Sequence, residues 1–131
     1  MRHSLLPPGW PRPKGYANGI AARGRLIFTA GVIGWDEQER IVAPDLVGQF
    51  RQVLLNTLAI LAEGGAGAED VVRMTWYVID RDDYVARAAE IGAVYRELMG
   101  KTYPAMAVVE VAGLVERDAL IEIETTAVVP E

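Results

Sequence analysis

The sequence predicts an α+β fold in which two helices cover one face of a single sheet. Two stretches carry apolar residues at the three-to-four spacing of amphipathic helices, and several shorter stretches carry the alternation or the β-branched content of strands. These stretches follow one another in the order β-β-α-β-α-β-β, without an internal repeat. That order is typical of one sheet with its helices packed on one side.

The N-terminal region predicts an extended lead-in followed by a β-hairpin. Four prolines fall within residues 1–14, which we expect to be extended and not a separate domain, while residues 15–131 form the single domain. From Tyr16 onward, two strand-like stretches flank Arg23-Gly24. A glycine-containing turn between two such stretches predicts that they pair with each other.

Two helices are predicted from the apolar periodicity. Pro44-Asp45 opens the first, because proline is tolerated in a first turn and an acidic residue is favoured there, and Gly64-Gly65 ends it. The second runs from about Asp82 to Met99, with Gly100 as its stop. The apolar stripes contain Leu46, Phe50, Val53, Leu54, Leu58 and Leu61 in the first helix, and Tyr84, Val85, Ala88, Ile91, Tyr95 and Leu98 in the second.

Three further strands are predicted at Val71–Ile79, Ala105–Val111 and Ala119–Val129, the last two joined by a polar turn as a terminal hairpin. Glu110 faces Glu122 across that hairpin in one register and not in the next, so Glu110 is expected to be structural. The strands are apolar on both faces, which a sheet with one hydrated face does not need. We therefore expect the second face to be buried against other copies of the chain.

The composition argues against several kinds of site. The chain has no cysteine and one histidine, His3, so disulfides, thiolate chemistry and a Ser-His-Asp relay are not expected, and neither is a metal or a cofactor. A net charge of −5 with scattered basic residues argues against nucleic acid as the main partner. No apolar run approaches the about 20 residues of a membrane span, and no signal peptide is recognisable, so a cytoplasmic location is expected.

Several short motifs stand in a distinctive order. The strongest is Pro104-Ala105-x-Ala107-Val108-Val109-Glu110-Val111, followed by Leu114 and then by Ile121-Glu122-Ile123-Glu124 and Ala127; the others are Gly15-x-x-Asn18-Gly19, Ile27-Phe28-Thr29-Ala30-Gly31, Gln49 with Asn56 and Leu61, Asp70-Val71-Val72-x-Met74-Thr75, and Tyr95. Together they resemble the RidA/YjgF family, whose older names are endoribonuclease L-PSP and translation inhibitor. The resemblance covers nearly the whole chain.

The resemblance implies a chorismate-mutase-like fold and a homotrimer with ligand clefts between neighbouring subunits. Well-studied relatives hydrolyse reactive enamines and imines, such as 2-aminoacrylate, to keto acids and ammonia. In them an arginine after Pro-Ala holds the substrate carboxylate, a glutamate in the last strand positions the attacking water, and a tyrosine in the first strand helps to close the site. The matching positions here are Met106, Glu122 and Tyr16.

The chain departs from the family pattern at the implied cleft. Met106 offers a flexible apolar wall where an arginine contact would contribute ~1.5–3 kcal/mol, and Ala30-Gly31-Val32 stands where relatives often have Ser-Gly-Gln. A cleft bordered by Met106, Ala30 and Val32 should favour a ligand that is larger or less anionic than a small α-imino acid, so standard 2-aminoacrylate deaminase activity is not expected. Backbone N–H groups near Gly31 and Ala107 would polarise the substrate.

Several residue roles stay open at this point. Glu122 either does acid-base work or makes a salt bridge at a seam between subunits, whereas Glu124 is expected to be structural. Tyr16 either covers the cleft or packs against the lead-in, and Trp35 is either a lid or cleft residue or a hydrophobic plug.

The leading functional hypothesis is a small-metabolite-binding homotrimer that hydrolyses an imine, an enamine or a related electrophile, with Glu122 orienting water. The first alternative is a non-catalytic ligand-binding or regulatory trimer, which the missing arginine favours. The second is an endoribonuclease or translation inhibitor, which the acidic balance and the lack of a well-placed histidine disfavour.

Overall fold

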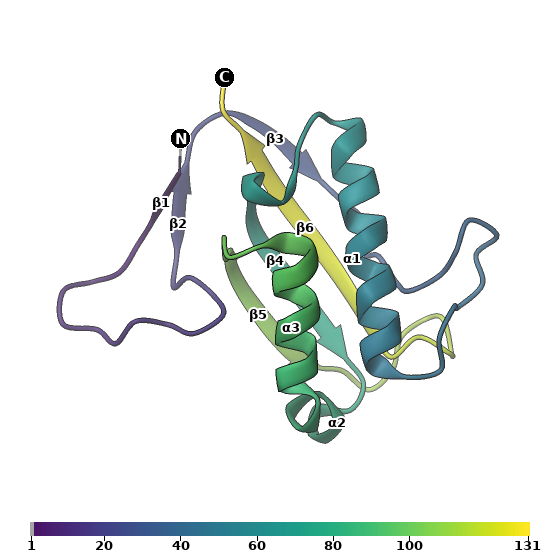
Figure 1. Cartoon of the computed structure of the whole chain (residues 1–131). Helices are drawn as coiled ribbons and strands as arrows, with labels where there is room; N and C mark the ends of the chain where they lie inside the picture. Colours follow the sequence, from purple (N-terminus) through teal and green to yellow (C-terminus); the bar gives the residue numbers. More distant parts are fainter. Residues whose placement is uncertain (1) are drawn as a thin grey trace.

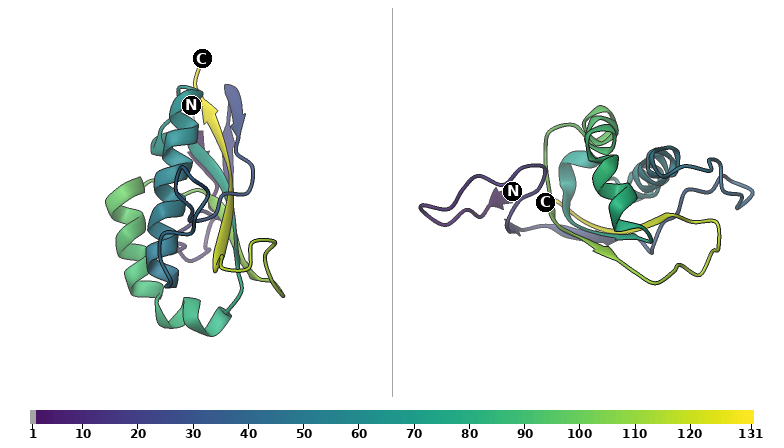
Figure 2. Two further views of the ribbon diagram at one scale, coloured as in Figure 1. Left: turned by 90° about the vertical axis from the view of Figure 1, so that its right-hand side faces the viewer. Right: turned by 90° about the horizontal axis from the view of Figure 1, so that it is seen from below.

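Two long helices pack against one face of a four-stranded sheet in the computed structural model, which describes residues 2–131 (Figure 1). Figure 2 shows both helices on the same side, with no helix over the opposite face. The predicted α+β class is therefore confirmed. In spatial order the strands are β3 (Arg25–Phe28), β6 (Ile121–Val129), β4 (Val71–Val78) and β5 (Ala105–Glu110), and only β4 and β5 run parallel.

The first helix, α1 (Leu46–Glu63), forms where the periodicity predicts it. The Asp45 side chain caps its N-terminus by accepting a hydrogen bond from the Gly48 N–H at 3.0 Å, and Gly64 ends it. Its apolar stripe faces the sheet, so that Phe50, Val53, Leu54 and Leu61 are fully buried together with strand residues Met74, Ile121 and Ile123. This layer is the hydrophobic core, and it makes one face of the sheet the buried face and the other the helix-free face.

The predicted second helix is two helices in the structure, α2 (Arg81–Ala86) and α3 (Ala88–Met99), so the single helix over 82–99 was wrong. Asp80 caps α2, and Arg87 leaves the helical conformation at φ −101° and ψ 10°. The break is hidden in the sequence because Tyr84 before it and Ile91 after it both pack towards the core. The apolar stripe therefore runs on while the backbone changes direction.

Both predicted hairpins are wrong, for the same topological reason. β2 (Ile20–Ala22) pairs with β1 (Arg2–Ser4) in a separate two-stranded sheet, while β3 pairs with β6. β5 does not pair with β6, because β4 lies between them. Adjacent stretches of sequence looked like hairpins, but β4, the helices and β5 form a parallel crossover unit, which brings β5 to the far side of β4.

Glu110, which was considered as a partner of Glu122, lies elsewhere. Its carboxylate accepts a hydrogen bond from the Arg81 N–H at 2.7 Å, at the start of α2. Glu122 instead stands opposite Tyr77 of β4.

The predicted lead-in begins with a strand that is fastened to the domain. The Arg2 guanidinium donates hydrogen bonds to the backbone oxygens of Glu69, Val71 and Tyr103 at 2.7–3.1 Å. Further along, the Ala17 N–H donates to the Pro104 oxygen at 2.9 Å. These bonds hold the N-terminal segment along the outer edge of β5.

Gln49 is a buried polar side chain that joins α1 to two loops. Its amide nitrogen donates to the oxygens of Ala43 and Asp118 at 3.0 and 2.9 Å, and its oxygen accepts from the Leu120 N–H at 2.7 Å. The side chain is only 1% exposed. Removing it would leave two part-buried backbone oxygens and one part-buried backbone N–H without their protein partner.

We expect Gln49→Ala to lower the free energy of unfolding by about 2–4 kcal/mol. Gln52→Ala is the matched control, since Gln52 lies on the same helix and bonds only to Asn56 in the part of the chain described. Urea unfolding at one fixed protein concentration measures both. Equal midpoints for the two variants would contradict the structural role of Gln49.

Candidate functional site

A β-bulge at Ala30-Gly31 interrupts the pairing that continues beyond β3. The Thr29 N–H donates to the Thr125 oxygen at 2.9 Å and the Val32 N–H to the Ile123 oxygen at 2.8 Å. Two residues on one strand therefore lie opposite Glu124 alone on the other. Such bulges leave residues outside the ladder and re-aim the chain, often beside functional sites.

The bulge brings Gly31 directly against the Glu122 carboxylate. A Cβ atom on Gly31 would lie 2.0 Å from Glu122 Oε2, so a side chain at position 31 would force the Glu122 carboxylate to move. Glu122 is half-buried, and its side chain makes no hydrogen bond or ion pair within residues 2–131. Its carboxylate is therefore available to a ligand or to water.

Glu124, two residues further along the same face, is already engaged. The Tyr77 hydroxyl donates to Glu124 Oε1 at 2.6 Å. This hydrogen bond raises the pKa of Tyr77, because the neutral phenol is the form that can donate. The two carboxylates, which lie on the same strand face, therefore differ: Glu124 has a hydrogen-bond partner, whereas the Glu122 carboxylate has none within residues 2–131.

The helix-free face of the sheet combines these groups with apolar side chains. Because Met74, Trp76 and Val78 point towards the helices, Arg73, Thr75 and Tyr77 point the other way, in rows with their partners on β5 and β6. Large apolar residues on this face are open to solvent: Phe28 is 67% exposed, Leu26 57% and Val109 41%. The apolar character that the sequence predicted for this face is present.

A hollow of about 400 Å³ lies beside the bulge, lined by Ala30, Gly31, Trp35, Asn56 and Ile60 among others. The Asn56 amide donates to the oxygens of Ile33 and Trp35 at 3.2 and 2.8 Å, and so fixes the loop that carries the tryptophan. Trp35 is half-buried at this wall. Val32 also lines the hollow, but it is only 6% exposed and packs in the core, so little of its side chain can contact a ligand.

A second hollow, of about 250 Å³, contains the other predicted site residues. Tyr16 and Met106 line it together with Lys14, Gly15, Tyr84 and Val108. The bond from Ala17 to Pro104 places Tyr16 here, by holding the N-terminal segment against the edge of β5. Tyr16 also lines a wider hollow of about 670 Å³ beside that segment, where the Arg2 guanidinium is already bonded to backbone oxygens.

Within one chain, the structure does not bring Met106 and Glu122 together. Met106 packs against the core on the helix side of β5, whereas Glu122 lies on the helix-free face of β6. The expected cleft bordered by Met106, Ala30 and Val32 is therefore not formed within a single chain. Successive side chains of a strand point to opposite faces of the sheet, and this alternation places Met106 and Glu122 on opposite faces.

Ala107 follows the same alternation. Its side chain lies on the helix-free face, opposite Thr75. The Val111 N–H donates to the Val78 oxygen of β4 at 2.8 Å. Because N–H directions alternate along a strand, the Ala107 N–H also points at β4 and is not available to a ligand.

Sequence reasoning missed two contributors to these hollows, Lys14 and Tyr84. Lys14 belonged to the proline-rich lead-in, and Tyr84 read as one more apolar position on a helix. Within residues 2–131, no group of three or more His, Asp or Glu side chains could hold a metal ion. Over the same residues, no helix is long and apolar enough to cross a membrane.

Comparison with known proteins gives consistent matches over almost the whole chain. The family described as Endoribonuclease L-PSP matches residues 11–129. The 2-iminobutanoate/2-iminopropanoate deaminase of Salmonella typhimurium is 37% identical over 113 residues, which cover 86% of each protein.

Solved structures give the same result. A protein of unknown function of the conserved Rid family, YyfB from Yersinia pestis, has a TM-score of 0.83 and 32% identity, with 98% of each chain covered. Escherichia coli TdcF with bound serine has a TM-score of 0.69 and 32% identity, covering 93% of this chain and 92% of that one.

Proposed function

The chain belongs to the RidA/YjgF family, and from that premise we propose that it is a homotrimer that binds a small metabolite between subunits and hydrolyses an imine, an enamine or a related electrophile. The observation that carries the proposal is the unpaired Glu122 carboxylate held against Gly31 on an uncovered, partly apolar sheet face. A relative named as an imine deaminase supports the reaction class.

The cleft is built from two half-sites on different subunits. One half-site contains Glu122 and Gly31 on the helix-free face, and the other contains Tyr16 and Met106 at the edge of β5. Since one chain keeps them on opposite faces, a neighbouring copy packed on the helix-free face supplies the second half. Burial of Phe28 and Leu26 in that contact gives the assembly its driving force.

Each half-site has a chemical task. Glu122 accepts a proton from water, which adds to the carbon of the C=N bond, while the nitrogen is protonated; breaking of the C–N bond then releases a carbonyl compound and ammonia. The Gly31 N–H lies outside the ladder and can donate to the substrate, whereas the Ala107 N–H cannot. Met106 and Tyr16 shape the wall that excludes water.

The substrate differs from that of a standard 2-aminoacrylate deaminase. Met106 supplies no cation, and Ala30 supplies no hydroxyl, so a small α-imino acid loses two polar contacts. The loss of the arginine contact alone weakens binding by about tenfold or more. A larger substrate recovers affinity from apolar contact with the methionine wall.

Mixing two inactive variants tests the half-site arrangement. Glu122→Gln removes the carboxylate, and Met106→Trp fills the hollow beside Tyr16. If each cleft takes one half from each of two subunits, random trimers formed from equal amounts regain about a quarter of the wild-type clefts. Turnover of an imine generated in situ, measured after the mixture is unfolded and refolded together, gives the recovered fraction.

Two other outcomes would contradict the proposed function. No recovery in mixed trimers would show that the two groups do not share a cleft between subunits. Tight binding of a metabolite by the wild type, with no turnover of any imine in a broad panel, would instead establish a ligand-binding or regulatory trimer. RNA cleavage is not proposed, because His3, the one histidine, lies on β1 and not at either half-site.

A further inference from the structure

A fourth hollow, of about 190 Å³, opens beside Met106 and is walled by aromatic rings. Trp76 lies edge-on to Tyr84 with ring centroids 6.4 Å apart, and Tyr95 stacks on Tyr103 at 5.4 Å. All four side chains line the hollow, which shares Lys14, Gly15, Tyr84 and Met106 with the hollow at Tyr16. Such a slot suits a flat apolar group.

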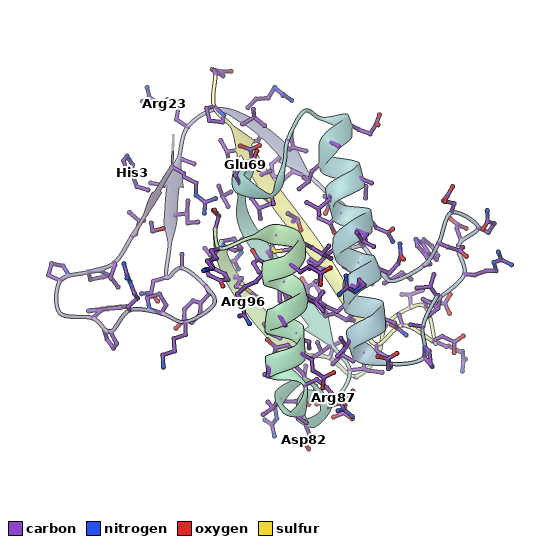
Figure 3. The ribbon with its side chains drawn as sticks, viewed as in Figure 1. His3, Arg23, Glu69, Asp82, Arg87 and Arg96 are labelled. Carbon is purple, nitrogen blue, oxygen red and sulfur yellow. The ribbon has the colours of Figure 1, made fainter. Side chains whose placement is uncertain are left out.

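The hollow is also lined by a cationic side chain that has no ion-pair partner within residues 2–131. Arg96, in the last turn of α3, is exposed and makes no ion pair within residues 2–131. Its Nη1 would lie 3.2 Å from a Cβ atom on Gly92, so the guanidinium lies over the bare backbone one turn earlier. Figure 3 shows Arg96 on the side of α3 that faces the N-terminal segment.

The charge around the hollow has one sign. Lys14 lines it together with Arg96, and among the residues described no Asp or Glu does. The neighbouring acidic residue on α3, Glu97, is bonded to Arg51 at 2.8 Å on a different side. Two cations and no carboxylate among the described lining residues favour an anionic group on whatever the slot accepts.

The aromatic wall also lacks one hydrogen bond. The Trp76 indole is 96% buried, being 4% exposed, and its N–H has no partner in residues 2–131. Buried donors are almost always paired. Trp76 is a lining residue of the hollow, so a group bound there would lie against the indole ring.

We propose that this hollow is the subsite for an acid whose carboxylate binds Arg96 and Lys14 and whose aryl or similar flat apolar group lies among the tyrosines. The proposal rests on the proposed function for the position of the cleft at Met106. It means that the cation missing at position 106 is supplied by α3. The substrate class is therefore an aryl-bearing carboxylic acid and not a small α-imino acid.

Phenylacetate and phenylacetamide are the probes, because they share the aryl group and differ in the terminal group, which is an anionic carboxylate in one and a neutral amide in the other. Isothermal titration of the wild type should give a Kd for phenylacetate at least about tenfold lower than for phenylacetamide. Arg96→Gln should remove that preference, while Arg96→Lys should keep part of it.

Arg23→Gln is the matched control, since it removes the same charge from an exposed arginine on a distant turn, also labelled in Figure 3. A preference that survives in Arg96→Gln would overturn the assignment, as would a wild type that binds the two probes equally or binds neither at about 10 mM. Hydrolysis by the wild type and its loss in Glu122→Gln are measured separately. A protein that hydrolyses imines without preferring phenylacetate therefore refutes only the Arg96 subsite.

Discussion

We expect Glu122→Gln to lower the turnover number of the proposed imine hydrolysis by about 10²- to 10⁴-fold and to leave the fold and the oligomeric state unchanged. Glutamine keeps the shape of the side chain but cannot take a proton from water. No bond within residues 2–131 depends on the Glu122 charge, so the substitution removes chemistry and not structure. The measurement generates the imine in situ with an amino-acid oxidase and follows its disappearance against semicarbazide trapping.

Glu124→Gln is the control, because its amide oxygen can still accept the hydrogen bond from Tyr77. This variant should retain turnover close to that of the wild type. Gly31→Ala tests the same carboxylate from the other side, since the added methyl group must displace Glu122 and should lower turnover too. Equal turnover of the Glu122→Gln protein and the wild type would remove Glu122 from the reaction.

The sequence predicted best the features that follow from the side-chain pattern along a single helix or strand. The apolar stripe of α1 and the alternation of β4 and β6 fix which side chains enter the core, and the structure buries Leu54, Met74 and Ile123 accordingly. The two-sided apolar character of the strands was equally visible, because it needs no knowledge of strand order. Periodicity reports burial, and burial is what these residues share.

Strand pairing could not be read in the same way. The stretches ending at Ala22 and beginning at Arg25 are separated by a plausible turn, yet Gly24 there lets the chain pass close to the Val129 oxygen and leads β3 to β6. Nothing local distinguishes that path from a hairpin. The order of strands depends on long-range contacts that sequence spacing does not encode.

The site shows the same division between local and long-range information. Glu122 and Tyr16 were selected through the resemblance to a family, but their separation from each other follows from strand alternation and order together. Arg96 carried no signal at all, because a lone arginine near the end of a helix usually serves the helix dipole. Only the position of Arg96 beside the hollow indicates a ligand-binding role.

We expect Phe28→Glu to dissociate the proposed assembly, which makes this substitution the most direct test of the helix-free face as a contact between copies. Phe28 is 67% exposed in the single chain and stands in a row with Thr126, Arg73 and Ala105. Burying a phenylalanine contributes about 2–3 kcal/mol, and an unpaired carboxylate in the same place costs several more. The dissociation constant should therefore rise by at least about a thousandfold.

Sedimentation velocity at micromolar concentration measures the change, and circular dichroism checks that each subunit stays folded. Leu55→Glu is the matched control, because Leu55 is an exposed apolar residue on α1, on the helix side of the sheet. It should sediment as the wild type does. If Phe28→Glu also sediments as the wild type, or if the wild type is itself a lone subunit, the two half-sites never meet. Catalysis would then have to be sought within one chain, where Glu122 faces solvent without Met106 or Tyr16.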